Sequence, residues 1–189
     1  VRKEAQELGL SVANKPDSYD ICFIPEGDTR DWLKDFTSAE PGVIIDEAGN
    51  QVGTHDGHVG FTIGQRKGLG IALGFPAYVT RIEKDTNRVV LGNYEDLAKN
   101  AMTVGKLSMG KYDNLIGQPI PTITKVRYND PGTEAIIEQV GDKMKVHFLS
   151  GVHAIAPGQA AVFYEGNDVV GGGWIESNYN SDYNLNVLQ

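Results

Sequence analysis

The sequence predicts an α+β protein that is mostly β, with a small central domain followed by an antiparallel C-terminal β-barrel. Two observations support this fold class. Glycine accounts for 23 of the 189 residues, about 12% against a usual ~7%, and this excess favours turns and short strands. Between Met102 and Glu176 no helical period persists, and short apolar runs recur with Gly or Pro between them. A chain of this length also buries enough surface to need no metal or disulfide for its core.

Residues 1–10 are predicted to form the end of a helix. Ala5 and Leu8 can share one face, and Gly9 lies where a left-handed C-terminal cap is expected. Because neither a Met nor an N-cap residue precedes this helix, we expect the chain to begin partway through a larger protein. Further on, the apolar run 21–24 ends at Pro25, which is typical of a brief buried strand.

Two β-hairpins are predicted in the central part of the chain. In the first, residues 42–45 and 51–53 flank a turn that contains glycine. In the second, residues 78–83 pair with residues 88–92.

The barrel is predicted from short strands separated by turns. They are expected at 123–128, 133–139, 143–148, 160–164 and 168–175. The remaining residues, 177–189, are polar and rich in Asn, which predicts a flexible tail.

The net charge of −8 argues against a general basic field that would attract nucleic acid. The acidic residues are concentrated at the two ends, because residues 1–60 hold 5 basic and 12 acidic side chains and residues 165–189 hold 4 acidic and none basic. Residues 61–164 hold 12 basic and 9 acidic side chains. A locally basic face in the middle of the chain is therefore compatible with the sequence.

The single cysteine, Cys22, excludes a Cys-based zinc site and a disulfide within the chain. A lone Cys between apolar neighbours is most often buried and inert. The nearby Asp17 and Asp20 would also disfavour a thiolate. His55 and His58 flank an aspartate, but with no third ligand at a metal-binding spacing we interpret them as surface polar residues and predict no metal site.

Two basic segments are candidates for contact with a polyanion. Residues 64–70 frame Arg66 and Lys67 with glycines, which let a backbone approach phosphate closely, although the Walker spacing is missing. In the predicted strand 123–128, Lys125 and Arg127 share one face and Tyr128 lies on the other. Such a pair suits backbone contact and base stacking. The alternatives are a basic turn on a sheet and a solvated strand face above a core Tyr.

Several of these blocks together resemble the family of bacterial tRNA-specific 2-thiouridylases. The block at 62–71, Thr-Ile-Gly-Gln-Arg-Lys-Gly-Leu-Gly-Ile, is highly specific, and the resemblance extends up to about Glu176. The other blocks follow in the family's order: Gly9-Leu10, Lys15, Asp17-Ser18, residues 21–24, Pro41-Gly42, Gly53, His55, residues 125–128 and residues 157–164.

The resemblance implies that this chain is the C-terminal part of an enzyme that transfers persulfide sulfur to C2 of an ATP-activated wobble uridine in tRNA. It implies that Cys22 carries the persulfide and is catalytic. It also implies that Arg127, Tyr128 and Gln159 contact tRNA. Arg66 and Lys67 on the glycine-framed turn are predicted to bind tRNA as well, and the alternative is that this turn packs against the missing N-terminal domain. The implied domains are 1–27, the tail of the N-terminal catalytic domain; 28–97, the central domain; 98–176, the barrel; and 177–189, the flexible tail.

The chain lacks the family's S-G-G-x-D-S phosphate loop and its first catalytic cysteine. The resemblance therefore implies that ATP and Mg²⁺ are used by an absent N-terminal domain, that no cofactor binds here, and that this part alone is inactive. In the intact enzyme it implies ATP binding, a disulfide bond, and a sulfur-relay protein or cysteine desulfurase as persulfide donor.

A different class of function suits the barrel pattern and the basic middle equally well. This alternative is a non-catalytic RNA-binding or translation-factor-like β-barrel module. The sequence context of Cys22 favours the enzyme, because a pure binding module has no use for it. No apolar run approaches the ~20 residues of a membrane span, and no signal peptide opens the chain. We therefore expect no membrane partner and a cytoplasmic location.

Overall fold

The structure, a computed structural model, describes residues 2–15 and 40–183. It divides the chain into two compact units, residues 1–38 and residues 39–189. Cys22, with the predicted strand around it, lies outside the described residues.

The first unit contains the predicted helix end. Helix α1 spans Arg2–Glu7. After it, the Gly9 amide donates to the Gln6 carbonyl at 3.0 Å, and the Leu10 amide donates to the Ala5 carbonyl at 2.9 Å. This pair of bonds is the Schellman pattern, in which a left-handed residue ends the helix. The predicted role of Gly9 is confirmed, since its φ is 67°.

The second unit begins with a four-stranded sheet whose order is β2-β1-β4-β3. Both predicted hairpins are confirmed, and a parallel pairing of β1 with β4 joins them. The sequence did not predict this pairing, because it depends on the course of the long connection between β2 and β3. The elements are β1 (Gly42–Asp46), β2 (Gln51–His55), the 3-10 helix η1 (His58–Gly60), β3 (Tyr78–Glu83) and β4 (Arg88–Gly92).

One face of this sheet carries a small core of its own. Ile44, Val79 and Leu91 are buried there. Leu69 and Ile71, from the glycine-rich connection, pack against them. The predicted basic segment 64–70 is therefore attached to the sheet by its apolar residues.

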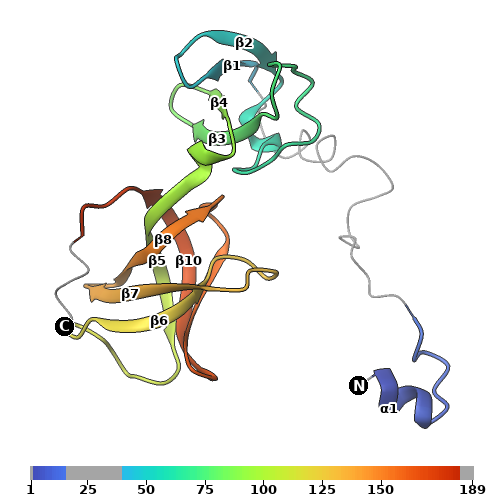
Figure 1. The fold of residues 1–189 in the computed structure, drawn as a ribbon, viewed down its shortest axis with the longest axis vertical. Helices are drawn as coiled ribbons and strands as arrows, with labels where there is room; N and C mark the ends of the chain where they lie inside the picture. Colours follow the sequence, from blue (N-terminus) through green and yellow to red (C-terminus); the bar gives the residue numbers. More distant parts are fainter. Residues whose placement is uncertain (1, 16–39, 184–189) are drawn as a thin grey trace. The chain divides into compact units, whose positions relative to one another are not determined.

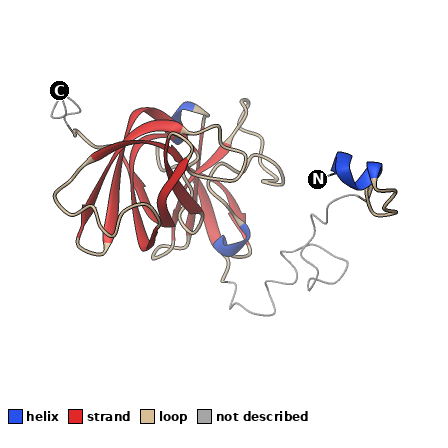
Figure 2. Ribbon diagram, turned by 90° about the horizontal axis from the view of Figure 1, so that it is seen from below, coloured by secondary structure: helices blue, strands red, loops and turns tan. Residues whose placement is uncertain are grey.

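The six remaining strands close into an antiparallel barrel, in the order β10-β5-β8-β7-β6-β9 (Figure 1). Strands make up most of the regular structure of residues 40–183 (Figure 2). The predicted fold class is confirmed. The elements are the 3-10 helix η2 (Glu95–Leu97), β5 (Ala98–Met109), β6 (Ile120–Lys125), β7 (Thr133–Val140), β8 (Lys143–His153), β9 (Ala160–Glu165) and β10 (Asp168–Tyr179).

The interior of the barrel is apolar and closely packed. Phe163, Met102 and Met144 are among its fully buried side chains. In β8, alternate residues point inward, and Met144, Val146 and Phe148 face the core. Such a core supports loops at both ends of the barrel without itself offering a site.

The sequence did not reveal the first barrel strand, β5. Its alternation is disturbed by register shifts against both neighbours, between Lys99 and Ala101 and opposite Gly172 to Trp174. Each shift moves the following side chains to the other face, so the burial pattern of β5 has no regular period of two. Lys106, at φ 49°, lies within the second irregular stretch.

Three consecutive glycines in β10, residues 171–173, let this strand approach its neighbours closely. A Cβ on Gly172 would come within 2.5 Å of the Ala161 carbonyl oxygen of β9, and one on Gly173 within 2.5 Å of the Gly105 carbonyl oxygen of β5. A side chain at either position would push a barrel strand away. The glycine run is therefore required by barrel closure.

The expected strand 123–128 is wrong at both ends. Strand β6 spans Ile120–Lys125, and the chain then leaves the barrel in a loop. The buried Asp130 shapes this loop, because its carboxylate accepts the amide of Val126 at 2.9 Å and that of Gly132 at 3.0 Å. Consequently Tyr128 is 97% exposed instead of lying in the core.

The expectation of a flexible tail from residue 177 is wrong for residues 177–183. Strand β10 continues to Tyr179. Beyond it, Asn100 and Ser181 exchange two hydrogen bonds of 2.9 and 2.7 Å, and Tyr183 stacks on His147 with ring centroids 3.9 Å apart. The polar sequence predicted exposure to solvent, but these residues contact Asn100 and His147 on strands of the barrel.

Candidate nucleic-acid interface

The predicted basic segments meet at the end of strand β8, at residues His153 and Ala154. The Arg127 guanidinium donates through Nη1 to the His153 carbonyl at 3.3 Å. The next residue, Ala154, has a φ of 57° and donates its amide to the Leu97 carbonyl at 3.3 Å. A left-handed alanine costs about 1–2 kcal/mol, so its surroundings must hold it in place.

The glycine-framed turn packs on this same alanine. A Cβ built on Gly64 would lie 2.6 Å from the Cβ of Ala154. The turn is fastened to β3, because the Gly64 amide donates to the Val79 carbonyl at 2.8 Å and the Val79 amide donates to the Gln65 carbonyl at 2.9 Å. Arg66 follows directly and is exposed.

Arg127 and the 64–67 turn thus contact two consecutive residues, His153 and Ala154. The Cα atoms of consecutive residues are about 3.8 Å apart across a trans peptide. Arg66 and Lys67 both remain exposed. This arrangement places the exposed Arg127 guanidinium and the turn that carries the exposed Arg66 and Lys67 at the same end of β8, on a chain with a net charge of −8.

Tyr128 and Gln159 lie at the same end of the barrel. Strands β6 and β9 pair antiparallel, with Lys125 opposite Val162 as the last partners. The loop after β6 and the turn before β9 are therefore neighbours. Gln159 is exposed, while its backbone is held by hydrogen bonds to Ala156 and Ile175.

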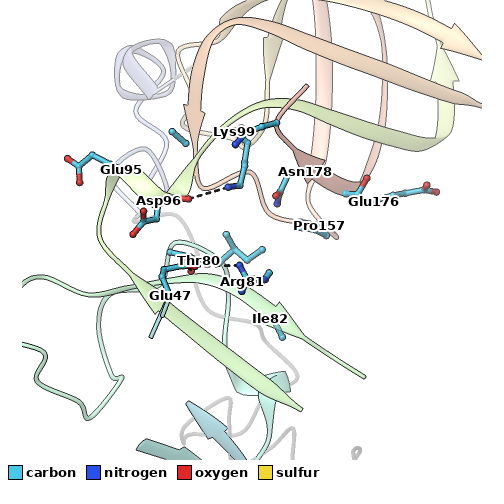
Figure 3. Close-up of a pocket in the computed structure, with 14 residues that line it drawn as sticks. Glu47, Thr80, Arg81, Ile82, Glu95, Asp96, Lys99, Pro157, Glu176 and Asn178 are labelled. Atoms are coloured by element: carbon cyan, nitrogen blue, oxygen red, sulfur yellow. Dashed lines mark hydrogen bonds and ion pairs between the residues drawn. The ribbon is translucent and has the colours of Figure 1, made fainter. Parts of the chain in front are cut away.

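A polar cavity of about 560 Å³ lies next to this surface, between the four-stranded sheet and the barrel (Figure 3). Ile63, beside the glycine-framed turn, and Pro157, beside Gln159, are among its lining residues. The Thr80 hydroxyl donates to the Glu47 carboxylate, and Lys99 donates to the Asp96 carbonyl at 3.4 Å.

The charge of this cavity is unfavourable for a triphosphate. Its lining has four carboxylates but two cations, and one of these, Arg81, is paired with Glu47 at 3.6 Å. Carboxylates and phosphate are both negatively charged, so they repel each other at close range. The residues present therefore do not fit ATP in this cavity. The four carboxylates are Glu47, Glu95, Asp96 and Glu176, and the cations are Arg81 and Lys99.

The interpretation of His55 as a surface residue is wrong. His55 is 7% exposed, accepts the Gly57 amide at Nδ1 over 3.0 Å, and makes an edge contact with Phe61. Burial lowers the pKa of His55. His58 instead pairs with Asn87 at 2.9 Å. Within residues 2–15 and 40–183, the structure has no cluster of three or more His, Cys, Asp or Glu side chains that could hold a metal ion.

The sequence did not reveal the aromatic residues near the junction, the place at His153 and Ala154 where Arg127 and the glycine-framed turn meet. Tyr94 stacks on His153 with centroids 4.2 Å apart and planes 8° from parallel, and it meets Tyr78 edge to face at 5.6 Å. Tyr78 begins β3, Tyr94 lies two residues after the end of β4, and His153 ends β8. The one available signal was the placement of Tyr78 and Tyr94 at the open end of a predicted hairpin.

Comparison with known proteins places the chain in a family. Residues 1–26 match a family model described as a tRNA methyl transferase HUP domain. Residues 30–93 match a tRNA methyl transferase PRC-barrel domain, and residues 101–175 match an aminomethyltransferase beta-barrel domain. The tRNA-specific 2-thiouridylase MnmA of Amoebophilus asiaticus is 53% identical over 185 residues, covering 95% of this chain and 49% of that protein.

The chain belongs to the tRNA-specific 2-thiouridylase family. The family member from Cytophaga hutchinsonii is 54% identical, over 96% of this chain and 51% of its own length. The 2-thiouridylase from Lachnoclostridium phytofermentans is 42% identical, over 93% of this chain and 50% of its length. The chain thus spans about half the length of the curated 2-thiouridylases that it matches. In the part of the chain that the structure describes, no helix has the length and apolar character needed to cross a bilayer.

Proposed function

We propose that this chain is the C-terminal, tRNA-binding part of a tRNA 2-thiouridylase and that Cys22 carries the persulfide sulfur. The observation that carries the tRNA role is the meeting of Arg127 and the Gly64 turn at His153 and Ala154. Two segments far apart in the sequence, each with exposed basic residues, contact the same end of β8 there. The exposed Tyr128 beside Arg127 adds a ring on which a base can stack.

The net charge of −8 sets a physical condition on this proposal. Repulsion from the whole chain opposes an RNA, so attraction must come from a local cluster within the charge-screening length, about 8 Å at physiological ionic strength. Arg66, Lys67 and Arg127 are the residues that we propose for this cluster. Binding should accordingly be weak at high salt and sensitive to each of these charges.

For Cys22 we propose nucleophilic sulfur transfer. The outer sulfur of a Cys22 persulfide forms a bond to C2 of an activated uridine, and the activating group leaves with the original oxygen. The S–S bond must then be broken by a second thiol, which is left as a disulfide with Cys22. Because the chain has one Cys, that thiol belongs outside these residues.

The remaining parts of the reaction are assigned to other components. We propose that ATP and Mg²⁺ act in an N-terminal domain, with a sulfur-relay protein or cysteine desulfurase loading Cys22. The carboxylates that line the polar cavity support the assignment of ATP to another domain.

We also propose a cytoplasmic location. The proposed domain limits are 28–97 for the central domain and 98–176 for the barrel. The 189 residues alone should be inactive and should not bind Mg-ATP tightly, and micromolar binding in calorimetry would contradict this.

The tRNA role is tested by measuring tRNA affinity over a salt series in the intact enzyme. Arg127→Ala should weaken binding and reduce the slope of log affinity against log salt by roughly 0.7–0.9. Arg88→Ala is the matched control, because Arg88 is also exposed but begins β4, at the other end of that strand from Tyr94. If Arg127→Ala keeps both affinity and slope, the role is wrong at that position.

The role of Cys22 separates the enzyme from a non-catalytic RNA-binding module. Cys22→Ser in the intact enzyme should abolish thiouridine formation while tRNA affinity stays nearly unchanged, since a hydroxyl carries no persulfide and the charge is the same. Thiouridine formation by this variant at the wild-type rate would refute the role of Cys22. Tight tRNA binding by the intact wild-type protein without any thiouridine formation would instead favour the binding module.

A further inference from the structure

An aromatic cavity of about 480 Å³ adjoins the junction of His153 and Ala154. It is lined by Phe75, Pro76, Tyr78, Asn93, Tyr94 and Glu95. Phe75 is 49% exposed and Tyr94 is 48% exposed. Large aromatic residues normally bury most of their surface, so two half-exposed rings at one hollow need a physical reason.

Two aromatic neighbours hold the ring of Tyr94. Tyr94 stacks on His153 at 4.2 Å, and Tyr78 and Tyr94 meet edge to face at 5.6 Å. Tyr94 is therefore already the second layer of a stack, and its exposed surface offers a place for a third. Planar aromatic groups favour such offset stacking over contact with water.

His153 links a lining residue of the cavity, Tyr94, to the proposed tRNA surface. The carbonyl of His153 accepts the Arg127 guanidinium at 3.3 Å, while its ring covers Tyr94. An RNA backbone neutralised by Arg127 would pass close to the cavity mouth. The link to the proposed tRNA surface and the aromatic lining together indicate a planar group of the RNA as the ligand.

We infer that this cavity takes an unpaired nucleobase of the bound tRNA, stacked on Tyr94 and Phe75. The inference rests on the proposed tRNA role and adds a base-binding site to it. A single carboxylate, Glu95, lines the cavity, and among its six lining residues there is no cation to attract phosphate. A carboxylate can instead accept a hydrogen bond from the amino edge of a base.

The inference is tested with an anticodon stem–loop RNA and a fully paired RNA duplex, each bound to the intact enzyme. Phe75→Ala should weaken stem–loop binding by at least about fivefold and leave the salt slope unchanged, because stacking neutralises no phosphate. Phe75→Tyr, which keeps the ring, should restore affinity. Duplex binding should be the same in all three proteins, because a duplex offers no unpaired base.

A second measurement locates the base directly. With 5-iodouridine in the loop, irradiation should cross-link the RNA to Phe75 or Tyr94, as identified by mass spectrometry. Unchanged stem–loop affinity in Phe75→Ala, with cross-links elsewhere, overturns the inference while the tRNA role stands. If the wild type binds neither RNA, the tRNA role fails and this site fails with it.

A protein segment seated in the cavity is the competing occupant. In that case Phe75→Ala would lower the melting temperature or alter the oligomeric mass of the enzyme without changing its affinity for either RNA. That result also overturns the inference. Tyr94→Leu serves as the second variant, and its effect on stem–loop binding should exceed its effect on duplex binding.

Discussion

Gly64 and Ala154 lie in direct contact, although 90 residues separate them in the sequence, and each has a left-handed backbone. The φ angles are 85° and 57°. This contact joins the glycine-framed turn of the sheet to the end of barrel strand β8. It therefore determines where Arg66 and Lys67 lie relative to Arg127.

Gly64→Ala should destabilise the protein and disturb this arrangement. A left-handed alanine costs about 1–2 kcal/mol, and the clash with Ala154 should add about 1–3 kcal/mol of overpacking. Gly70→Ala is the matched control, because Gly70 has a φ of 69° but a Cβ there meets nothing within 4 Å. Chemical denaturation of both variants isolates the packing contribution. Equal losses of stability would contradict the contact.

Asp130→Ala should unfold the loop that carries Arg127. Its carboxylate accepts two backbone amides, those of Val126 and Gly132, and Val126 is buried. Leaving a buried amide without an acceptor costs about 1–3 kcal/mol.

Asp130→Asn is the graded control for this loop, since it keeps one acceptor oxygen and should lose less stability. Unfolding free energies and tRNA affinities are to be measured together. If Asp130→Ala lowers stability but not affinity, the position of Arg127 does not depend on this loop.

Stability should fall as the pH drops below about 6.5, the ordinary histidine value. Burial lowers the pKa values of both His147 and His55, because it disfavours the charged ring. Between each folded-state pKa and 6.5, the unfolded chain binds more protons, so stability rises with pH in that window. Below the folded-state pKa the loss levels off.

His147→Phe should flatten this pH dependence while keeping the stack on Tyr183. Tyr183→Ala should flatten it as well, because His147 regains water and its pKa moves back toward the ordinary value. Thermal melts between pH 5 and pH 8 measure both effects. An unchanged pH profile in both variants would assign the dependence to other groups.

Arg66→Ala should reduce the salt slope of tRNA binding, because a contact to phosphate is lost. The melting temperature should stay unchanged, because the Arg66 side chain is exposed. Lys67→Ala should behave alike. A drop in melting temperature with an unchanged slope would instead indicate that this turn packs against another part of the intact enzyme.

Local sequence patterns determined most of the secondary structure. The hairpin strands β3 and β4 agree with the expected ranges, because alternating apolar residues and turn residues act over a few positions. The capping of α1 by Gly9 is predictable for the same reason. The cations Arg66, Lys67 and Arg127 were also recognisable as residue types.

Tertiary structure decided how these pieces meet. The parallel pairing of β1 with β4, the irregular strand β5 and the ordered residues 177–183 all depend on partners distant in the sequence. The loop position of Tyr128 depends on Asp130, and the stack of Tyr94 on His153 joins a hairpin to the barrel. A local sequence pattern reflects the conformational preference of each residue. Burial and contact are set by the neighbours that folding brings to it, so the proposed binding surface emerges only in the folded chain.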